Sequence, residues 1–306
     1  MHLLDYFTDP VLRAPTIGCM LMCFASSLVG VLVFIRKRSL LGESLSHASY
    51  PGVVLSALLF SFLTPSSDQL VGVGILAGAF LSALLGFFLI DLLEKRFRVK
   101  SDAALCLILS VFFGVGVLLA SRIQITHALW YKQIQIFLYG QAATMTDVQI
   151  VIYSLLALVI LCVIGVFYRK IEILYFDREF AKSVGVPVRL VDQLILFLLV
   201  LAIVVGIRSV GIVLMSGMLI APPIAGRQCA KRLPGVFFFS GFFGLASGFL
   251  GNYFSVEIPL WLKKSGYMGK FSLPTGPLII LCAATICVVC LLFAKESRFK
   301  RSRISS

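Results

Sequence analysis

Long, nearly uncharged apolar stretches recur along the whole chain, and short segments rich in lysine and arginine separate them. A helix that crosses the hydrocarbon core of a bilayer needs about 20 mostly apolar residues. Inside lipid every backbone amide must find a partner, which leaves helices and closed barrels as the structures that span. Alternating segments of about ten residues, which are typical of barrels, are absent from this sequence. The pattern therefore predicts an all-α, polytopic membrane protein.

About nine transmembrane helices are expected. The chain of 306 residues is 59% hydrophobic and 13% charged, whereas soluble domains are about 45–50% apolar and about 25% charged. This composition excludes a soluble enzyme, a disordered chain and a nucleic-acid-binding module. The predicted spans are Thr16–Ile35, His47–Leu63, Leu70–Ile90, Ala103–Ser121, Val148–Phe167, Val191–Ile207, Val210–Ala225, Gly235–Gly251 and Leu278–Ala294.

The basic residues predict the orientation of the chain. Most of the 27 lysines and arginines fall in alternate segments, at residues 36–38, 95–100, 169–189, 227–232 and 295–303. The positive-inside rule places these segments in the cytoplasm. The N-terminus is then outside and the C-terminus inside. Both tryptophans, Trp130 and Trp261, fall in the outer segments, as expected of an aromatic belt.

The net charge of +13 is therefore interpreted as a topology signal and not as a nucleic-acid surface, which would be continuous. The basic tail at residues 295–306 is expected to touch anionic lipid. One transmembrane domain fills residues 1–306, and no cleavable signal is visible in the first residues. The sequence holds no G-x-x-x-x-G-K-[ST] phosphate loop, so the energy for any transport is expected from a gradient or from a partner chain.

One segment pairs a carboxylate with an imidazole where a basic segment enters the second span. Glu43 and His47 are four residues apart and share one face of a helix, with Cβ atoms about 5–6 Å apart. Mixed oxygen and nitrogen ligands suit manganese, iron or zinc, and ionisable groups within a membrane are candidates for function. The spacing alone leaves a second interpretation open, in which Glu43 favours the helix dipole and His47 bonds a neighbouring carbonyl.

A second segment lies in the largest basic loop, residues 169–190. The sequence predicts a short helix there, with Asp177 as its cap, Glu179 in its first turn and Gly185 as its left-handed end. Apolar residues spaced by four, Phe176, Phe180 and Val184, would form one stripe. Such a stripe fits either a groove on a partner protein or the membrane surface.

A third segment, Val210–Ala225, carries Pro222 and Pro223, which predict a helix kink. Two small-residue patterns, Gly74-x-x-x-Gly78-x-x-x-Ser82 and Gly244-x-x-x-Gly248, predict close helix contacts. The eight cysteines are scattered. Cys287-x-x-Cys290 lies within the ninth span without a second pair and is interpreted as helix packing.

Together these segments resemble the ABC-3 family, the integral-membrane permeases of bacterial ABC importers for manganese, zinc or iron. The family pattern R-R-x-S-L-x-G-D-A-L-S-H-A-x-x-P-G-V stands here as Arg36-Lys-Arg-Ser-Leu-Leu-Gly-Glu-Ser-Leu-Ser-His-Ala-Ser-Tyr-Pro-Gly-Val53. The pattern F-D-P-E-F-A-R-S-L-G-V stands as Phe176-Asp-Arg-Glu-Phe-Ala-Lys-Ser-Val-Gly-Val186. Val210–Ala225 and the L-P-T-G-P run at Leu273–Pro277 match as well, so the resemblance runs from about Thr16 to Ala294.

The resemblance implies a permease subunit in a bacterial inner membrane that pairs with a second permease subunit, of the same or a related chain. A cytoplasmic ABC ATPase dimer would dock on the segment Phe176–Gly185, and an extracytoplasmic solute-binding protein would deliver the ion. Glu43 and His47 would hold the transported divalent transition metal, which is a substrate, and no permanent cofactor is expected. The family aspartate is Glu43 here. The family Pro-Ala-Ala has become Ala221-Pro-Pro-Ile-Ala225, and Pro222 and Pro223 are expected to act in the helix kink and in gating.

Three other functions stay open from the residues themselves. An ion-gradient-driven secondary transporter usually shows broken helices with buried acids in two related halves. A permease for a siderophore or cobalamin would need a wider path without metal ligands. A structural or assembly protein would not need Glu43 and His47. The neighbouring genes would separate these functions, since an ATPase and a binding lipoprotein beside this gene favour the metal permease.

Overall fold

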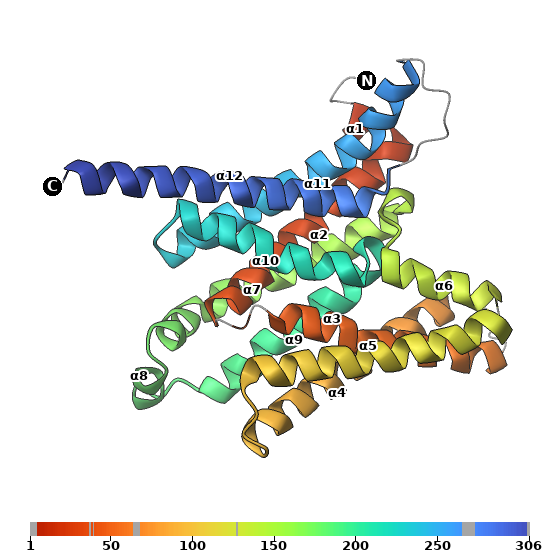
Figure 1. Cartoon of the computed structure of the whole chain (residues 1–306), viewed down its shortest axis with the longest axis horizontal. Coiled ribbons are helices and arrows are strands. Elements are labelled where there is room, and N and C mark those ends of the chain that lie inside the picture. The colour runs from red at the N-terminus through yellow and green to blue at the C-terminus, as the bar shows by residue number, and fades with distance from the viewer. Residues whose placement is uncertain are drawn as a thin grey trace. The chain divides into compact units, whose positions relative to one another are not determined.

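The structure is a computed structural model that describes residues 5–36, 38, 40–63, 68–126, 128–264 and 273–304. These residues form helices and connections without a strand, which confirms the predicted all-α class (Figure 1). The helices are α1 (Asp5–Thr8), α2 (Pro10–Ile35), α3 (Leu40–Leu63), α4 (Asp68–Lys95), α5 (Ser101–Thr126), α6 (Ala128–Tyr139), the 3₁₀ turn η1 (Ala142–Thr144), α7 (Asp147–Phe176), α8 (Arg178–Ser183), α9 (Val188–Val210), α10 (Ile212–Cys229), α11 (Leu233–Lys264) and α12 (Thr275–Ile304).

Seven helices in the described part are long and apolar enough to cross a membrane, namely α2, α4, α5, α7, α9, α11 and α12. The predicted count of nine is therefore not confirmed, and the orientation of the termini stays a prediction. The second and seventh predicted spans lie in α3 and α10. Small hydroxyl residues and His47 lower the hydropathy of the first half of α3, and α10 is a helix of 18 residues that contains Pro222 and Pro223.

The structure contains one helix outside the predicted spans and one helix that extends beyond its predicted end. The segment between the fourth and fifth predicted spans contains α6, and α11 continues through Pro259 to Lys264. Trp261 therefore lies on a helix, where its side chain is largely exposed. The side chains of the predicted basic tail, residues 295–306, lie outside the described part of the structure.

The chain divides into two compact units. One unit comprises residues 36–141 and 193–216, and α3 is its central helix, packed against α4, α5 and α6. The approach of α3 to α4 is backbone to backbone, because a Cβ on Gly52 would meet the carbonyl oxygen of Gly78. The Ser82 hydroxyl donates to the Ala48 carbonyl at 2.7 Å. The predicted Gly74–Gly78–Ser82 contact is thereby confirmed, with α3 as its partner.

The other unit comprises residues 1–35, 142–192 and 217–306, and α2 is its most buried helix. Helix α11 packs along α2, where a Cβ on Gly244 would lie 2.7 Å from the Cys23 carbonyl oxygen. A Cβ on Gly248 would lie 2.9 Å from the Cys19 carbonyl oxygen. The second small-residue pattern is therefore also a close helix contact, as predicted.

Buried polar contacts fix the predicted outer end of this unit. The side-chain amide of Asn252 donates to the Thr16 hydroxyl at 2.7 Å, and the Tyr6 hydroxyl donates to Glu257 Oε1 at 3.1 Å. Burial raises the pKa of Tyr6 well above its usual range, and the Glu257 carboxylate raises it further. Tyr6 therefore stays a neutral hydrogen-bond donor, which secures α1 against α11.

Candidate metal site and coupling segment

Helix α3 begins just ahead of the predicted metal ligands. The Leu41 amide donates to the Arg38 carbonyl at 3.0 Å, and Glu43 lies in the first turn. A carboxylate at that position is favoured by the helix dipole. Three small hydroxyl side chains of the same stretch, Ser44, Ser46 and Ser49, are fully buried. These small residues allow neighbouring helices to pack closely around this part of α3.

Glu43 and His47 lie one helical turn apart on α3, and both side chains are half-buried. At this spacing the Cβ atoms of two helical residues lie about 5–6 Å apart. The His47 Nδ1 atom is buried and has no hydrogen-bond partner among the described residues. The imidazole packs edge-on against Phe113 of α5, with ring centroids 4.8 Å apart. The structure therefore brings the two predicted ligands to one face, and His47 Nδ1 makes no hydrogen bond to a carbonyl of the described residues.

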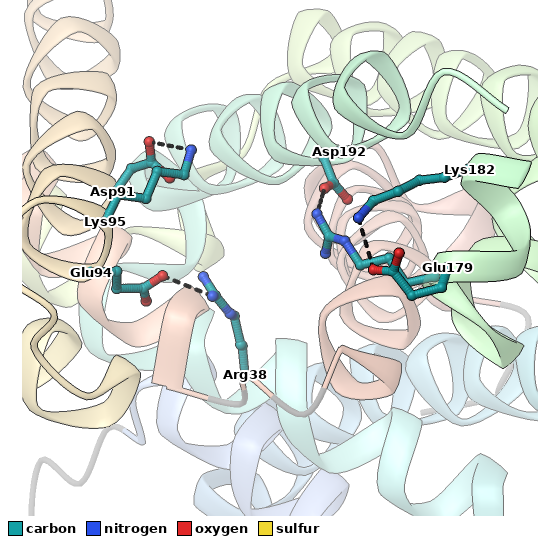
Figure 2. A network of polar contacts seen from close by, with 8 residues as sticks. Arg38, Asp91, Glu94, Lys95, Glu179, Lys182 and Asp192 are labelled. Carbon is teal, nitrogen blue, oxygen red and sulfur yellow. Dashed lines mark hydrogen bonds and ion pairs between the residues drawn. The ribbon is translucent and has the colours of Figure 1, made fainter. Parts of the chain in front are cut away.

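Three polar contacts that the sequence analysis missed hold this part of α3. The Ser44 hydroxyl donates to the Leu105 carbonyl of α5 at 3.0 Å, and Ser82 of α4 bonds α3 as described above. Arg38 Nη2 pairs with Glu94 Oε2 at 2.8 Å (Figure 2). The Glu94 carboxylate also accepts from the Ser101 hydroxyl at 2.8 Å. No periodic signal marks such partners, since serines and a loop arginine are common in many contexts.

The described residues contain no group of three or more histidine, cysteine, aspartate or glutamate side chains that could hold a metal ion. Glu43 and His47 therefore contribute one oxygen donor and one nitrogen donor within a single chain. A stable transition-metal site needs about four or more ligands. The metal-ligand role of the pair therefore stays a prediction, and one chain alone would supply only two of these ligands.

The predicted coupling helix exists as α8 and begins as expected. The Asp177 carboxylate accepts from the Glu179 amide at 2.9 Å and from the Phe180 amide at 3.0 Å, which satisfies two free donors of the first turn. After α8, Gly185 has a φ of +79°, the left-handed conformation that favours glycine. The Val186 amide then closes the turn onto the Ala181 carbonyl. The cap and the glycine end are thus confirmed.

The predicted apolar stripe is partly wrong. Phe176 is the last residue of α7, and the extended backbone of Asp177 separates it from Phe180 on α8. The three residues therefore do not share one helix face. All three are nevertheless exposed, with relative accessibilities of 87% for Phe176, 55% for Phe180 and 55% for Val184. The segment presents apolar side chains away from its own unit.

Two ion pairs involve α8, one within the helix and one to α9. Lys182 Nζ pairs with Glu179 Oε1 at 2.8 Å along α8, and Arg178 Nη2 pairs with Asp192 Oδ2 of α9 at 2.7 Å. Figure 2 shows Lys182 reaching Glu179, and Asp192 beside them. These exposed pairs are worth at most about 1 kcal/mol each, so they orient the segment more than they stabilise it.

Pro222 and Pro223 lie inside α10, which continues past them to Cys229. The helical backbone is interrupted earlier, at Gly211, which has a φ of +89° and separates α9 from α10. Pro223 contacts α2, since its Cγ would lie 2.9 Å from a Cβ on Gly30. Pro223 therefore packs against a glycine of the neighbouring helix, and the gating role of the proline pair stays a prediction.

Comparison with known proteins places these features in a family. The model of the ABC 3 transport family matches residues 8–294. A probable metal transport system membrane protein of Chlamydia trachomatis is 39% identical over 94% of this chain, which spans 63% of the length of that relative. The zinc transport system membrane protein TroC of Treponema pallidum is 30% identical over 100% of this chain and 98% of its own length.

A solved structure agrees with this assignment. The structure of PsaBC from Streptococcus pneumoniae in complex with Fab superposes with a TM-score of 0.77 and 26% identity, over 98% of this chain and 98% of that chain. The apolar helices and the family match together show a multi-pass membrane protein. The chain belongs to the ABC 3 transport family.

Proposed function

We propose that this chain is the membrane-spanning permease subunit of a bacterial ABC importer that moves a divalent transition metal ion, manganese, zinc or iron, into the cytoplasm. A separate ATPase subunit supplies the energy. The family match over residues 8–294 and relatives named for metal and zinc transport support this proposal. The bacterial inner membrane is the corresponding location, with lipid around the exposed apolar helix faces.

The observation that carries the proposal is the Glu43–His47 pair on α3. A carboxylate oxygen and an imidazole nitrogen suit manganese, iron and zinc. The buried and unpartnered Nδ1 of His47 is a donor atom available for a ligand, because buried polar atoms are otherwise paired. In this proposal His47 and Glu43 bind the ion as it passes through the membrane, after an extracytoplasmic solute-binding protein has delivered it.

A second permease subunit completes the site. One chain supplies two ligands, and a two-fold axis repeats every contact in the partner. Two copies of Glu43 and His47 would therefore supply four ligands, enough for a tetrahedral ion. A related chain that carries the same pair would do so as well. The methylene by which Glu43 exceeds the family aspartate moves the carboxylate by about 1.5 Å, which affects the choice of metal.

The segment around α8 is the proposed contact with the ATPase dimer. Exposed Phe176 at the end of α7, Phe180 on the capped helix α8 and Val184 just after it fit a hydrophobic groove in a partner. Lys182 is paired within α8, and Arg178 is paired with Asp192 of α9. The exposed apolar side chains are the proposed contact with the ATPase, and ATP hydrolysis in that partner would be transmitted through them.

Metal uptake tests the transport claim. The chain, its neighbouring ATPase and its binding protein are expressed in a transport-deficient bacterium, and the accumulation of each metal is measured. We expect one transition metal to accumulate, and Glu43→Ala and His47→Ala to abolish uptake at normal expression. Asp102→Ala is the matched control, since Asp102 is an exposed first-turn acid of α5. Normal uptake in both site variants would remove the ligand claim. Accumulation of no metal, with all components assembled, would favour a siderophore-type permease.

Co-purification tests the coupling claim. Phe180→Asp introduces a charge into the proposed contact, and we expect it to detach or uncouple the ATPase. Val11→Asp is the control, because Val11 is more exposed than Phe180 but lies at the predicted outer end of α2. Unchanged ATPase association and activity in Phe180→Asp would refute the docking segment.

A further inference from the structure

Two cysteines from distant parts of the sequence meet where the end of α10 lies beside the middle of α12. The Sγ atoms of Cys229 and Cys290 lie 4.0 Å apart. Cys229 is the last residue of α10 and is exposed, and Cys290 of α12 is partly exposed. Both are free thiols. The spacing of Cys287 and Cys290 in the sequence indicated side chains that pack within a helix, and it predicted no contact with Cys229.

Helix packing brings the two thiols together. A Cβ on Gly217 would lie 3.0 Å from the Ile280 side chain, so α10 and α12 already touch well before they reach the cysteines. From Gly217 to Cys229 and from Ile280 to Cys290 the two helices advance by similar lengths, about 18 Å and 15 Å at 1.5 Å per residue. They therefore run side by side in the same direction, which keeps the thiols as neighbours.

The surroundings disfavour a metal site at this pair. A closed thiolate site for zinc needs four ligands. Cys287 lies one turn before Cys290, but it is buried at 8% accessibility. The described residues contain no metal-binding group of three or more cysteine, histidine or acidic side chains. Two thiols on adjacent helices, one of them open to solvent, are instead the arrangement of an oxidisable pair.

We propose that Cys229 and Cys290 are a reversible dithiol–disulfide pair that ties α10 to α12 when a peroxide is present. The exposed Cys229 thiol reacts with hydrogen peroxide to give a sulfenic acid and one water. The Cys290 thiol then attacks that sulfur, the S–S bond forms, and a second water leaves. A dithiol reductant reverses the reaction by thiol–disulfide exchange.

The geometry and the location both suit this chemistry. Disulfide-bonded cysteines have Cβ atoms about 3.5–4.5 Å apart, and thiols already in van der Waals contact need side-chain rotation more than backbone movement. Arg227 and Lys231 flank Cys229, and the basic run at residues 295–303 begins five residues after Cys290, so the pair lies near the predicted cytoplasmic boundary. Disulfides in that compartment are transient and are typical of redox sensing.

Mass spectrometry of the full-length chain in detergent tests the proposal without a transport assay. Purified protein is treated with hydrogen peroxide, excess thiol is alkylated, and the digest is analysed without reduction. We expect a crosslinked peptide that joins Cys229 to Cys290 within one chain, and its loss after treatment with dithiothreitol. Cys229→Ser and Cys290→Ser should each abolish the crosslink. Cys106→Ser, which removes an exposed cysteine of α5, should leave it unchanged.

Three results would overturn the proposal. The first is oxidation of Cys229 to sulfinic acid with Cys290 still reduced. The second is a crosslink between two copies of the chain in place of the internal one. The third is protection of both thiols from alkylation by zinc, which would make the pair part of a metal site. Because the crosslink is measured in the resting protein, its absence leaves the proposed transport function untouched.

Discussion

The close approach of α3 and α4 makes Gly52→Ala a sharp test of how the site-bearing helix is held. A Cβ at position 52 would lie 2.5 Å from the Ser82 Cβ and 2.7 Å from the Gly78 carbonyl carbon, and nearer still to the Gly78 oxygen. Ordinary contacts begin near 3.4 Å. The neighbours are backbone and Cβ atoms, which cannot rotate away. The two helices must therefore separate by about 1 Å, the difference between the 2.5 Å approach to the Ser82 Cβ and an ordinary contact of 3.4 Å.

Two effects of this substitution oppose each other. Alanine improves helix propensity over glycine by about 0.8–1.0 kcal/mol, whereas overpacking costs typically about 1–3 kcal/mol. Separating the helices also stretches the hydrogen bond from Ser82 to the Ala48 carbonyl, whose net worth is about 0.5–1.5 kcal/mol. The sum favours destabilisation by about 1–3 kcal/mol. It also shifts Glu43 and His47 relative to α4 and α5.

Thermal unfolding in detergent, followed by the loss of monodisperse protein on size exclusion, measures this effect. We expect Gly52→Ala to melt below the parent protein. Gly114→Ala on α5 is the matched control, because a Cβ there meets nothing within 4 Å and the propensity gain acts alone, so its melting temperature should equal or exceed the parent value. Equal melting temperatures for Gly52→Ala and Gly114→Ala would refute the account of α3–α4 packing.

Two further predictions concern the other unit and the topology. Thr16→Val leaves the buried Asn252 amide without its 2.7 Å partner and should lower the free energy of unfolding by about 1–3 kcal/mol. Thr285→Val removes an exposed hydroxyl that bonds its own helix, and it should be nearly neutral. Comparable melting temperatures for the two variants would contradict this prediction. Reporter fusions should place Arg178 in the cytoplasm and Trp261 outside, and the reverse result would overturn the predicted orientation.

The sequence was sufficient for the features that repeat or that carry strong local signals. Apolar stretches predicted the helices, and the glycine patterns predicted the contacts at Gly78 and Gly244. Asp177 and Gly185 predicted the two ends of α8, because capping and left-handed glycine are local preferences. The spacing of Glu43 and His47 predicted their common helix face for the same reason.

Features that depend on tertiary packing could not be predicted from the sequence. The ends of α11 were misjudged because its apolar stretch stops before the helix does. The apolar stripe was assumed to be continuous, although Asp177 turns the chain between Phe176 and Phe180. The approach of Cys229 to Cys290 depends on two helices that run side by side, and a single sequence does not report such pairing.

The most direct measurement of the central claim is pulsed electron paramagnetic resonance of Mn²⁺ bound to the assembled transporter. We expect nitrogen hyperfine coupling from the His47 imidazole, lost in His47→Ala and retained in Asp102→Ala. Glu43→Ala should lower manganese occupancy, since it removes the oxygen ligand of the pair. Unchanged nitrogen coupling and unchanged occupancy in His47→Ala would show that the ion binds elsewhere and would contradict the assignment of α3 as the metal-binding helix.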